Sequence, residues 1–168
     1  MRTVQSLSPR DLAAVACPWC GATPPRGERG LRALRDGHTL GVLVYGRADA
    51  ERDLCAPGAW VVEQLWVDPR EVGERIGTQL IQRACAELTG ERARCLIAYG
   101  ASGRPDCTHP PAGFLAAAGF AEHVGGVQWR LDLRRTVPVW TRLRDAGALG
   151  VRWWRTRPQA QPAGRVQT

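Results

Sequence analysis

The stretch WVVEQLWVDPREVGERIGTQL, Trp60–Leu80, decides the fold of this chain. Its first part, Trp60–Val67, is mostly apolar on both of its alternating faces, which predicts a buried strand at the centre of a sheet. Asp68 and Pro69 end that strand. From Ile76 onward, apolar residues recur three and four positions apart, which predicts an amphipathic helix. The core of the fold is therefore a strand, a short turn and a helix.

Strict alternation along the central strand predicts which side chains share a face. One face is expected to carry Val61, Glu63, Leu65 and Val67, and the other Trp60, Val62, Gln64 and Trp66.

The same patterns predict the other elements, and their order indicates a mixed α/β fold with a mostly antiparallel central sheet flanked by helices. The remaining strands are expected at Arg2–Leu7, His38–Tyr45, Arg94–Tyr99, Phe120–Val124 and Val127–Leu133. The remaining helices are expected from a Ser8 cap to near Cys17, at Leu31–Asp36 and at Ala112–Ala118. We expect one domain over residues 1–135, a helical C-terminal extension over 136–157 and a disordered tail over 158–168.

Composition excludes several classes of protein. The chain has 168 residues and a net charge of +7, and all its basic residues are arginines, so a lysine Schiff base and a P-loop lysine are excluded. The arginines are scattered rather than collected into one run, which favours an ordinary basic surface over a nucleic-acid partner. The chain has no apolar run that approaches the roughly 20 residues needed to cross a bilayer, so no membrane partner is expected. No signal peptide is evident, and the expected location is the cytoplasm.

The connection between the central strand and its helix resembles part of a phosphate cradle. Gly73 and Gly77 let a diphosphate approach the backbone closely, and the helix start presents N–H groups at the positive end of its dipole. Arg75, however, stands where a third glycine would be expected. The glycine spacing does not fit a Rossmann fingerprint.

The segment resembles the Gcn5-related N-acetyltransferase (GNAT) superfamily, which has a strand, V-D-P, a glycine loop and a helix in this order. Val67-Asp68-Pro69, Gly73, Ile76, Gly77 and Leu80 fall in step with that pattern, and Gly113–Phe120 is similar to the family's F-Y-x-x-x-G-F segment. The resemblance covers Trp60–Leu133 well and the N-terminal part only by element order. Three residues depart from it: Val72 and Arg75 in the loop, and Leu115 where the family often has a tyrosine that protonates the departing thiolate.

The resemblance implies that acetyl-CoA is the acyl donor. Backbone groups of Leu65, Trp66 and Val67 would then hold the pantetheine, and an N–H near Leu65 would polarise the thioester carbonyl. The diphosphate would lie on backbone N–H groups of Val72, Gly73, Glu74, Arg75, Ile76, Gly77 and Thr78.

Several side chains are candidates for proton transfer. Glu63 is the first choice as base, acting through water, and an ion pair with an arginine is an equally good interpretation. Tyr99 is a candidate acid or a buried structural tyrosine. His109, two residues after Cys107, is a further candidate, although such residues more often only line a loop. Water is another candidate acid.

Cys17-Pro-Trp-Cys20 matches half a zinc site or a redox pair. The nearest complement for a zinc ion is Cys107 with His109, far away in the sequence. We favour a structural or pocket-lining role for this motif and expect no metal site, with zinc binding and redox chemistry as alternatives.

The favoured function is an acetyl-CoA-dependent N-acetyltransferase that transfers the acetyl group directly to a primary amine of a small molecule or peptide. The alternative from another class is a non-catalytic acyl-CoA-binding or sensing module, and a third is a zinc- or nucleic-acid-binding domain. The sequence does not identify the acceptor, and a homodimer is compatible with it.

Overall fold

The computed structural model describes residues 1–51, 53, 55, 57–101 and 103–134. The strands are β1 (Arg2–Ser6), β2 (Arg29–Arg35), β3 (His38–Arg47), β4 (Ala59–Val67), β5 (Cys95–Tyr99), β6 (Ala121–Val124) and β7 (Gln128–Asp132). The helices are α1 (Pro9–Ala13), η1 (Pro69–Glu71, a 3₁₀ turn), α2 (Ile76–Gly90) and α3 (Ala112–Ala117). The expected extension over 136–157 and the tail over 158–168 lie outside the described residues.

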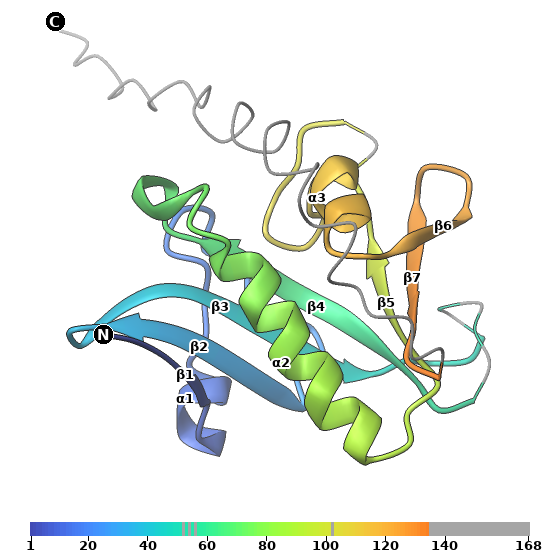
Figure 1. The fold of residues 1–168 in the computed structure, drawn as a ribbon, viewed down its shortest axis with the longest axis horizontal. Helices are drawn as coiled ribbons and strands as arrows, with labels where there is room; N and C mark the ends of the chain where they lie inside the picture. The colour runs from blue at the N-terminus through green and yellow to red at the C-terminus, as the bar shows by residue number, and fades with distance from the viewer. Residues whose placement is uncertain (52, 54, 56, 102, 135–168) are drawn as a thin grey trace, which may run out of the picture.

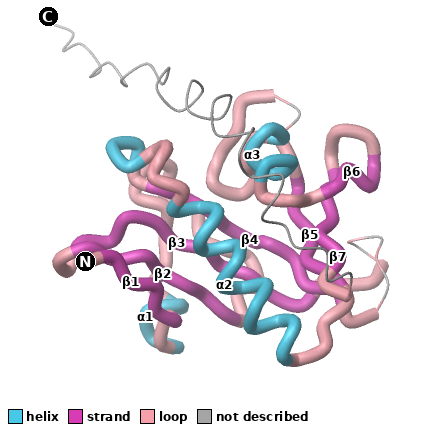
Figure 2. Tube along the Cα trace, in the orientation of Figure 1, coloured by secondary structure: helices cyan, strands magenta, loops and turns pink. Residues whose placement is uncertain are grey.

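The strands form one seven-stranded sheet in the order β1-β2-β3-β4-β5-β7-β6. Every neighbouring pair is antiparallel except β4 and β5, which run parallel. The predicted mixed, mostly antiparallel sheet is therefore confirmed. Helix α2 crosses one face of the sheet over β2, β3 and β4 (Figures 1 and 2). In the part of the chain that the structure describes, no helix is long and apolar enough to cross a membrane.

The main core lies between α2 and the sheet. Leu80, Ile81 and Leu88 of α2 are buried against Leu43 and Leu65 of the central strands. Burying a side chain of this size contributes about 1.5–3 kcal/mol to folding. The predicted central strand and the predicted helix are both confirmed as β4 and α2, and their ends differ from the expected ones by one or two residues.

The predicted assignment of β4 side chains to the two faces of the sheet is wrong beyond Val62, because the strand contains a bulge. Val62 pairs with Tyr45 and Gln64 pairs with Val44, which leaves Glu63 as the extra residue. A bulge shifts the alternation by one position. As a result the α2 face carries Trp60, Val62, Leu65 and Val67, while Gln64 and Trp66 point to the opposite face.

The helix predicted at Leu31–Asp36 is also wrong, because this segment is strand β2. Leu31 and Ala33 alternate into the core, and β2 pairs with both β1 and β3. Asp36 (φ 51°) and Gly37 (φ 82°) form the tight turn into β3. Two consecutive positive φ values are what a two-residue hairpin needs to match the strand twist. Helix α1 is also shorter than expected and ends at Ala13 rather than near Cys17.

Candidate functional site

The central strands β4 and β5 separate after three paired residues. Their parallel pairing runs from Ala59 opposite Cys95 to Val61 opposite Ile97. Further along, the loop between β5 and α3 approaches β4, and the Leu65 N–H donates a 2.6 Å hydrogen bond to the Cys107 carbonyl. The amide expected to polarise a thioester therefore has an internal acceptor in this structure.

The start of α2 follows the end of β4 after a short connection, residues 68–75, that contains η1. Arg75 is the N-cap, and its backbone is left-handed, with φ 59° and ψ 22°. This is the geometry that a third glycine would provide, and it costs a non-glycine residue roughly 1–2 kcal/mol. The first helical bond runs from the Gln79 N–H to the Arg75 carbonyl (3.0 Å). The N–H groups of the first three helical residues, Ile76, Gly77 and Thr78, consequently have no partner within the helix.

The glycines and the backbone bonds of the loop limit which groups remain for a ligand. Gly77 is buried, and a Cβ added to it would lie 3.0 and 3.1 Å from two atoms of the Phe114 ring. Gly73 has φ 97°, a conformation that favours glycine. The Glu74 N–H, in contrast, donates to the Glu71 carbonyl at 3.2 Å, so this predicted phosphate ligand is used within the turn.

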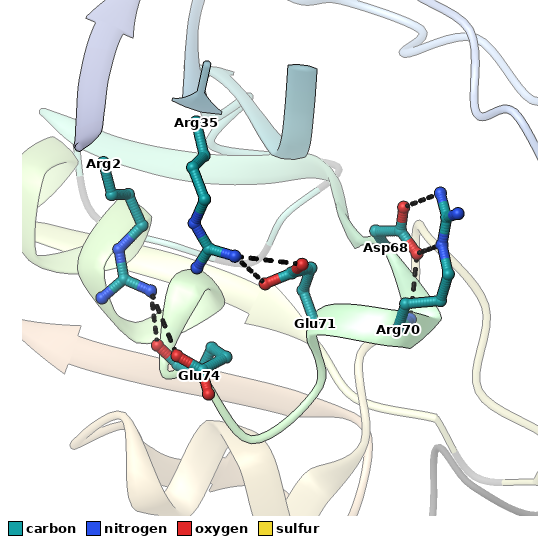
Figure 3. A network of polar contacts seen from close by, with 6 residues as sticks. All are labelled: Arg2, Arg35, Asp68, Arg70, Glu71 and Glu74. Atoms are coloured by element: carbon teal, nitrogen blue, oxygen red, sulfur yellow. Dashed lines mark hydrogen bonds and ion pairs between the residues drawn. The ribbon is translucent and has the colours of Figure 1, made fainter. Parts of the chain in front are cut away.

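Ion pairs with arginines hold the loop and balance its acidic residues (Figure 3). Arg35 of β2 contacts both carboxylate oxygens of Glu71, at 2.9 and 3.2 Å. Arg2 of β1 lies 3.9 Å from a carboxylate oxygen of Glu74 and also donates to the Glu74 backbone carbonyl at 2.9 Å. Arg70 contacts Asp68 at 2.8 Å, and hydrogen bonding from Arg70 lowers the pKa of Asp68. These pairs offset the negative charge that would otherwise oppose an anionic ligand at the start of α2.

The strained backbone at Arg75 gives a testable stability prediction. Arg75→Gly should raise the free energy of unfolding by about 0.5–1 kcal/mol, because the relief of left-handed strain exceeds the entropy cost of glycine. Arg92 has the same φ of 59° after the C-terminus of α2, so Arg92→Gly is a matched comparison. Urea unfolding of both variants measures the effect. If Arg75→Gly alone is destabilising, the contacts of the Arg75 side chain outweigh the strain.

Glu63 lies in a buried polar network on the face of β4 opposite α2. Its carboxylate oxygen is 3.8 Å from the Arg26 Nε, and another nitrogen of Arg26 is 3.9 Å from Asp53. Glu63 is 7% exposed and Asp53 1%. The Tyr99 hydroxyl donates to Asp53 at 2.9 Å, so the network joins two of the predicted catalytic residues. The sequence did not indicate Arg26, which lies in an irregular segment with no periodic pattern.

The other candidate acids differ in their surroundings. Burial, followed by the bond to Asp53, raises the pKa of Tyr99, which makes its hydroxyl a weaker acid. The ring of His109 lies 2.9 Å from the Thr108 hydroxyl and 3.3 Å from Asp106, within its own loop. Leu115 is fully buried in the core and has no group to transfer a proton.

Two segments that are distant in the sequence bring three cysteines together on the face of the sheet opposite α2. Cys17 and Cys20 follow α1, Cys107 precedes α3, and their sulfur atoms all lie within 4.8 Å of one another. Burial alone would raise the pKa of Cys20, but hydrogen bonds from Ala22, Cys107 and Cys17 lower it. Burial and the hydrogen bond to Cys20 raise the pKa of Cys107.

Comparison with known proteins agrees with this arrangement. The model of the acetyltransferase (GNAT) family matches residues 5–120, which is more than half of the chain. A search of curated proteins gives no match.

Solved structures share the fold at low sequence identity. A GNAT family acetyltransferase from Brucella melitensis, in complex with acetyl-CoA, has a TM-score of 0.56 and 20% identity over 82% of this chain and 92% of its own. The E. coli protein YhbS, in complex with CoA, has a TM-score of 0.59 and 13% identity over 79% and 81%. The ribosomal-protein-S18-alanine N-acetyltransferase of E. coli has a TM-score of 0.57 and 16% identity over 82% and 97%. By the family match over residues 5–120, and in accord with its fold, the chain belongs to the acetyltransferase (GNAT) family.

Proposed function

We propose that this protein is an acetyl-CoA-dependent N-acetyltransferase that transfers the acetyl group directly to a primary amine of a small molecule or peptide. Membership of the family supports acetyl transfer. The observation that carries the proposal is the separation of β4 from β5 beside the uncapped start of α2. The divergence provides a place for a thioester, and the helix start provides N–H donors for a diphosphate.

The cofactor would lie between these two features. Its diphosphate would contact the backbone from Val72 to Thr78 apart from the Glu74 N–H, which donates to Glu71. The chief donors would be the N–H groups of Ile76, Gly77 and Thr78, which precede the first helical bond. Its pantetheine would run along Leu65–Val67 of β4. The arginine pairs of the loop keep the nearby carboxylates from repelling it.

The transfer is a nucleophilic substitution at the thioester carbonyl. Glu63 takes a proton from the ammonium through water, and the neutral amine then forms a C–N bond as the C–S bond breaks. The acylated nitrogen would then lose its extra proton to water, and the leaving thiolate would accept a proton from water or from Tyr99. In this proposal the Leu65 N–H stabilises the oxyanion, which requires the Cys107 carbonyl to move away from it.

The hydrogen bond between Leu65 and Cys107 also favours a second candidate function, a non-catalytic acyl-CoA-binding or sensing module. In this alternative the loop stays in place, and coenzyme A binds without polarisation of its thioester. Leu115 also supports this alternative, because it is fully buried and stands at the position where a tyrosine often serves as acid in the family.

One experiment separates the two candidates. The protein is titrated with coenzyme A by calorimetry, and release of free thiol is then followed with acetyl-CoA and a panel of primary amines. The enzyme hypothesis expects saturable binding and thiol release that depends on an amine. Binding without turnover of any amine indicates the sensing module, and absence of binding contradicts both.

A further inference from the structure

The three cysteines on the face of β4 opposite α2 form a cluster that the proposed acetyl transfer does not use. Cys17 and Cys107 are buried, and Cys20 is exposed. The sulfur atoms of Cys20 and Cys107 are 3.3 Å apart, and the third sulfur lies within 4.8 Å of both. Eighty-seven positions separate Cys20 from Cys107 in the sequence. The meeting of these thiols is therefore a product of the tertiary fold.

The first two cysteines lie on a tight turn. The Gly21 N–H donates to the Cys17 carbonyl at 2.8 Å, and the Cys17 N–H donates to the Ala22 carbonyl at 2.9 Å. Gly21 has φ 71°, which lets the chain fold back directly after Cys20. The turn thus presents the Cys17 and Cys20 sulfur atoms to the same point.

Gln64 of β4 fixes the third cysteine against this turn. Its side-chain nitrogen donates to the Ala22 carbonyl at 2.7 Å and lies 3.7 Å from the Cys107 sulfur. The Cys107 carbonyl is in turn bonded to the Leu65 N–H. An N–H donor to sulfur stabilises a thiolate, and such outer contacts orient the ligands of metal sites.

The distances between the sulfur atoms fit one metal ion better than a disulfide. A zinc–sulfur bond is about 2.3 Å, so two sulfur ligands of a tetrahedral zinc lie about 3.8 Å apart. The observed separation of 3.3 Å and the 4.8 Å limit enclose that value. A disulfide would join two of these residues at about 2.05 Å and leave the third thiol unused.

We propose that Cys17, Cys20 and Cys107 bind one zinc ion, whose fourth position is taken by solvent or by a ligand outside this cluster. Each thiol gives its proton to solvent when its zinc–sulfur bond forms. His109 lies outside this group of three, and its ring contacts Thr108 and Asp106 instead. The proposal assigns a metal where the sequence favoured a pocket-lining role.

The metal would connect the two loops that border the centre of the sheet. It would hold the segment around Cys107 and, with it, the carbonyl that accepts from the Leu65 N–H. This consequence for catalysis rests on the proposed acetyl transfer, whereas the metal site itself does not. Its test is therefore made without acetyl-CoA.

The experiment measures the metal content of the full chain purified without a metal-affinity tag and kept reduced. After incubation with zinc and gel filtration, elemental analysis should find about one zinc per chain. Replacement by Co²⁺ should give a thiolate-to-cobalt charge-transfer band. Cys17→Ser and Cys107→Ser should each lose that band and most of the zinc. Cys55→Ser changes a half-buried cysteine outside the cluster and should keep both.

A second measurement uses the unmodified chain, so that the test does not depend on whether the variants fold. In the unmodified chain, zinc should slow the reaction of a thiol reagent with the exposed Cys20 and raise the midpoint of thermal unfolding. The proposal is overturned if the reduced chain retains no zinc, or if Cys107→Ser binds zinc and cobalt as the unmodified chain does. Recovery of a Cys20–Cys107 disulfide whose reduction restores no zinc binding also overturns it.

Discussion

Replacing Glu63 by glutamine is expected to lower kcat by about 100-fold, because loss of a positioned general base costs on this order. The substitution keeps the size of a side chain that is only 7% exposed and placed at the bulge of β4. It removes the group that would accept the ammonium proton, and it leaves the start of α2 unchanged. The affinity for coenzyme A should therefore stay the same. Steady-state kinetics with a saturating amine and calorimetry with coenzyme A measure the two effects.

The alternative role of Glu63 is an ion pair with Arg26, and it predicts a different result. If Glu63 only balances Arg26, the variant should lose stability and keep kcat, since the pair lies 3.8 Å apart in a buried network. Glu51→Gln is a matched control, because it removes the same charge from an exposed residue in the connection between β3 and β4. A kcat that rises again at high pH in Glu63→Gln, as the amine loses its proton unaided, supports the base. An unchanged kcat at neutral pH contradicts it.

The sequence predicts those parts of the fold that depend on local patterns. The apolar run of β4 and the periodicity that begins at Ile76 are local, and both elements lie where they were expected. The left-handed backbone at Arg75 also agrees with the expectation of a glycine at that position. Strand, turn and helix are thus determined by residues close to one another in the chain.

The errors arise where distant contacts decide the structure. The bulge at Glu63 is defined by the register between β4 and β3, and alternation within β4 alone does not reveal it. Leu31–Asp36 has good helix formers, but pairing with β1 and β3 on both sides makes it a strand. The same reasoning applies to the site. No local pattern indicated that Arg26 would join Glu63 to Asp53, or that the Cys107 carbonyl would meet the Leu65 N–H.

Replacing Gly77 by valine is expected to weaken the binding of coenzyme A on the order of 100-fold, which corresponds to about 2.7 kcal/mol. Gly77 is the second residue of α2, and its N–H is one of the three that precede the first helical bond. A Cβ at this position already lies 3.0 Å from the Phe114 ring, and the branched side chain of valine extends further. The side chain points at Phe114, so it must displace that ring or shift the backbone at the start of α2, whose N–H groups would hold the diphosphate.

Gly113 provides the matched control, because it is the second residue of α3 and a Cβ there meets nothing within 4 Å. Gly113→Val carries the same change in helix propensity at the same helical position, and it should keep the affinity for coenzyme A. Circular dichroism must first show that both variants are folded at the temperature of the titration, since displacement of Phe114 also costs stability. If folded Gly77→Val binds coenzyme A as tightly as Gly113→Val does, the diphosphate does not lie on the start of α2. The splayed end of β4 would then have to hold the cofactor by other contacts.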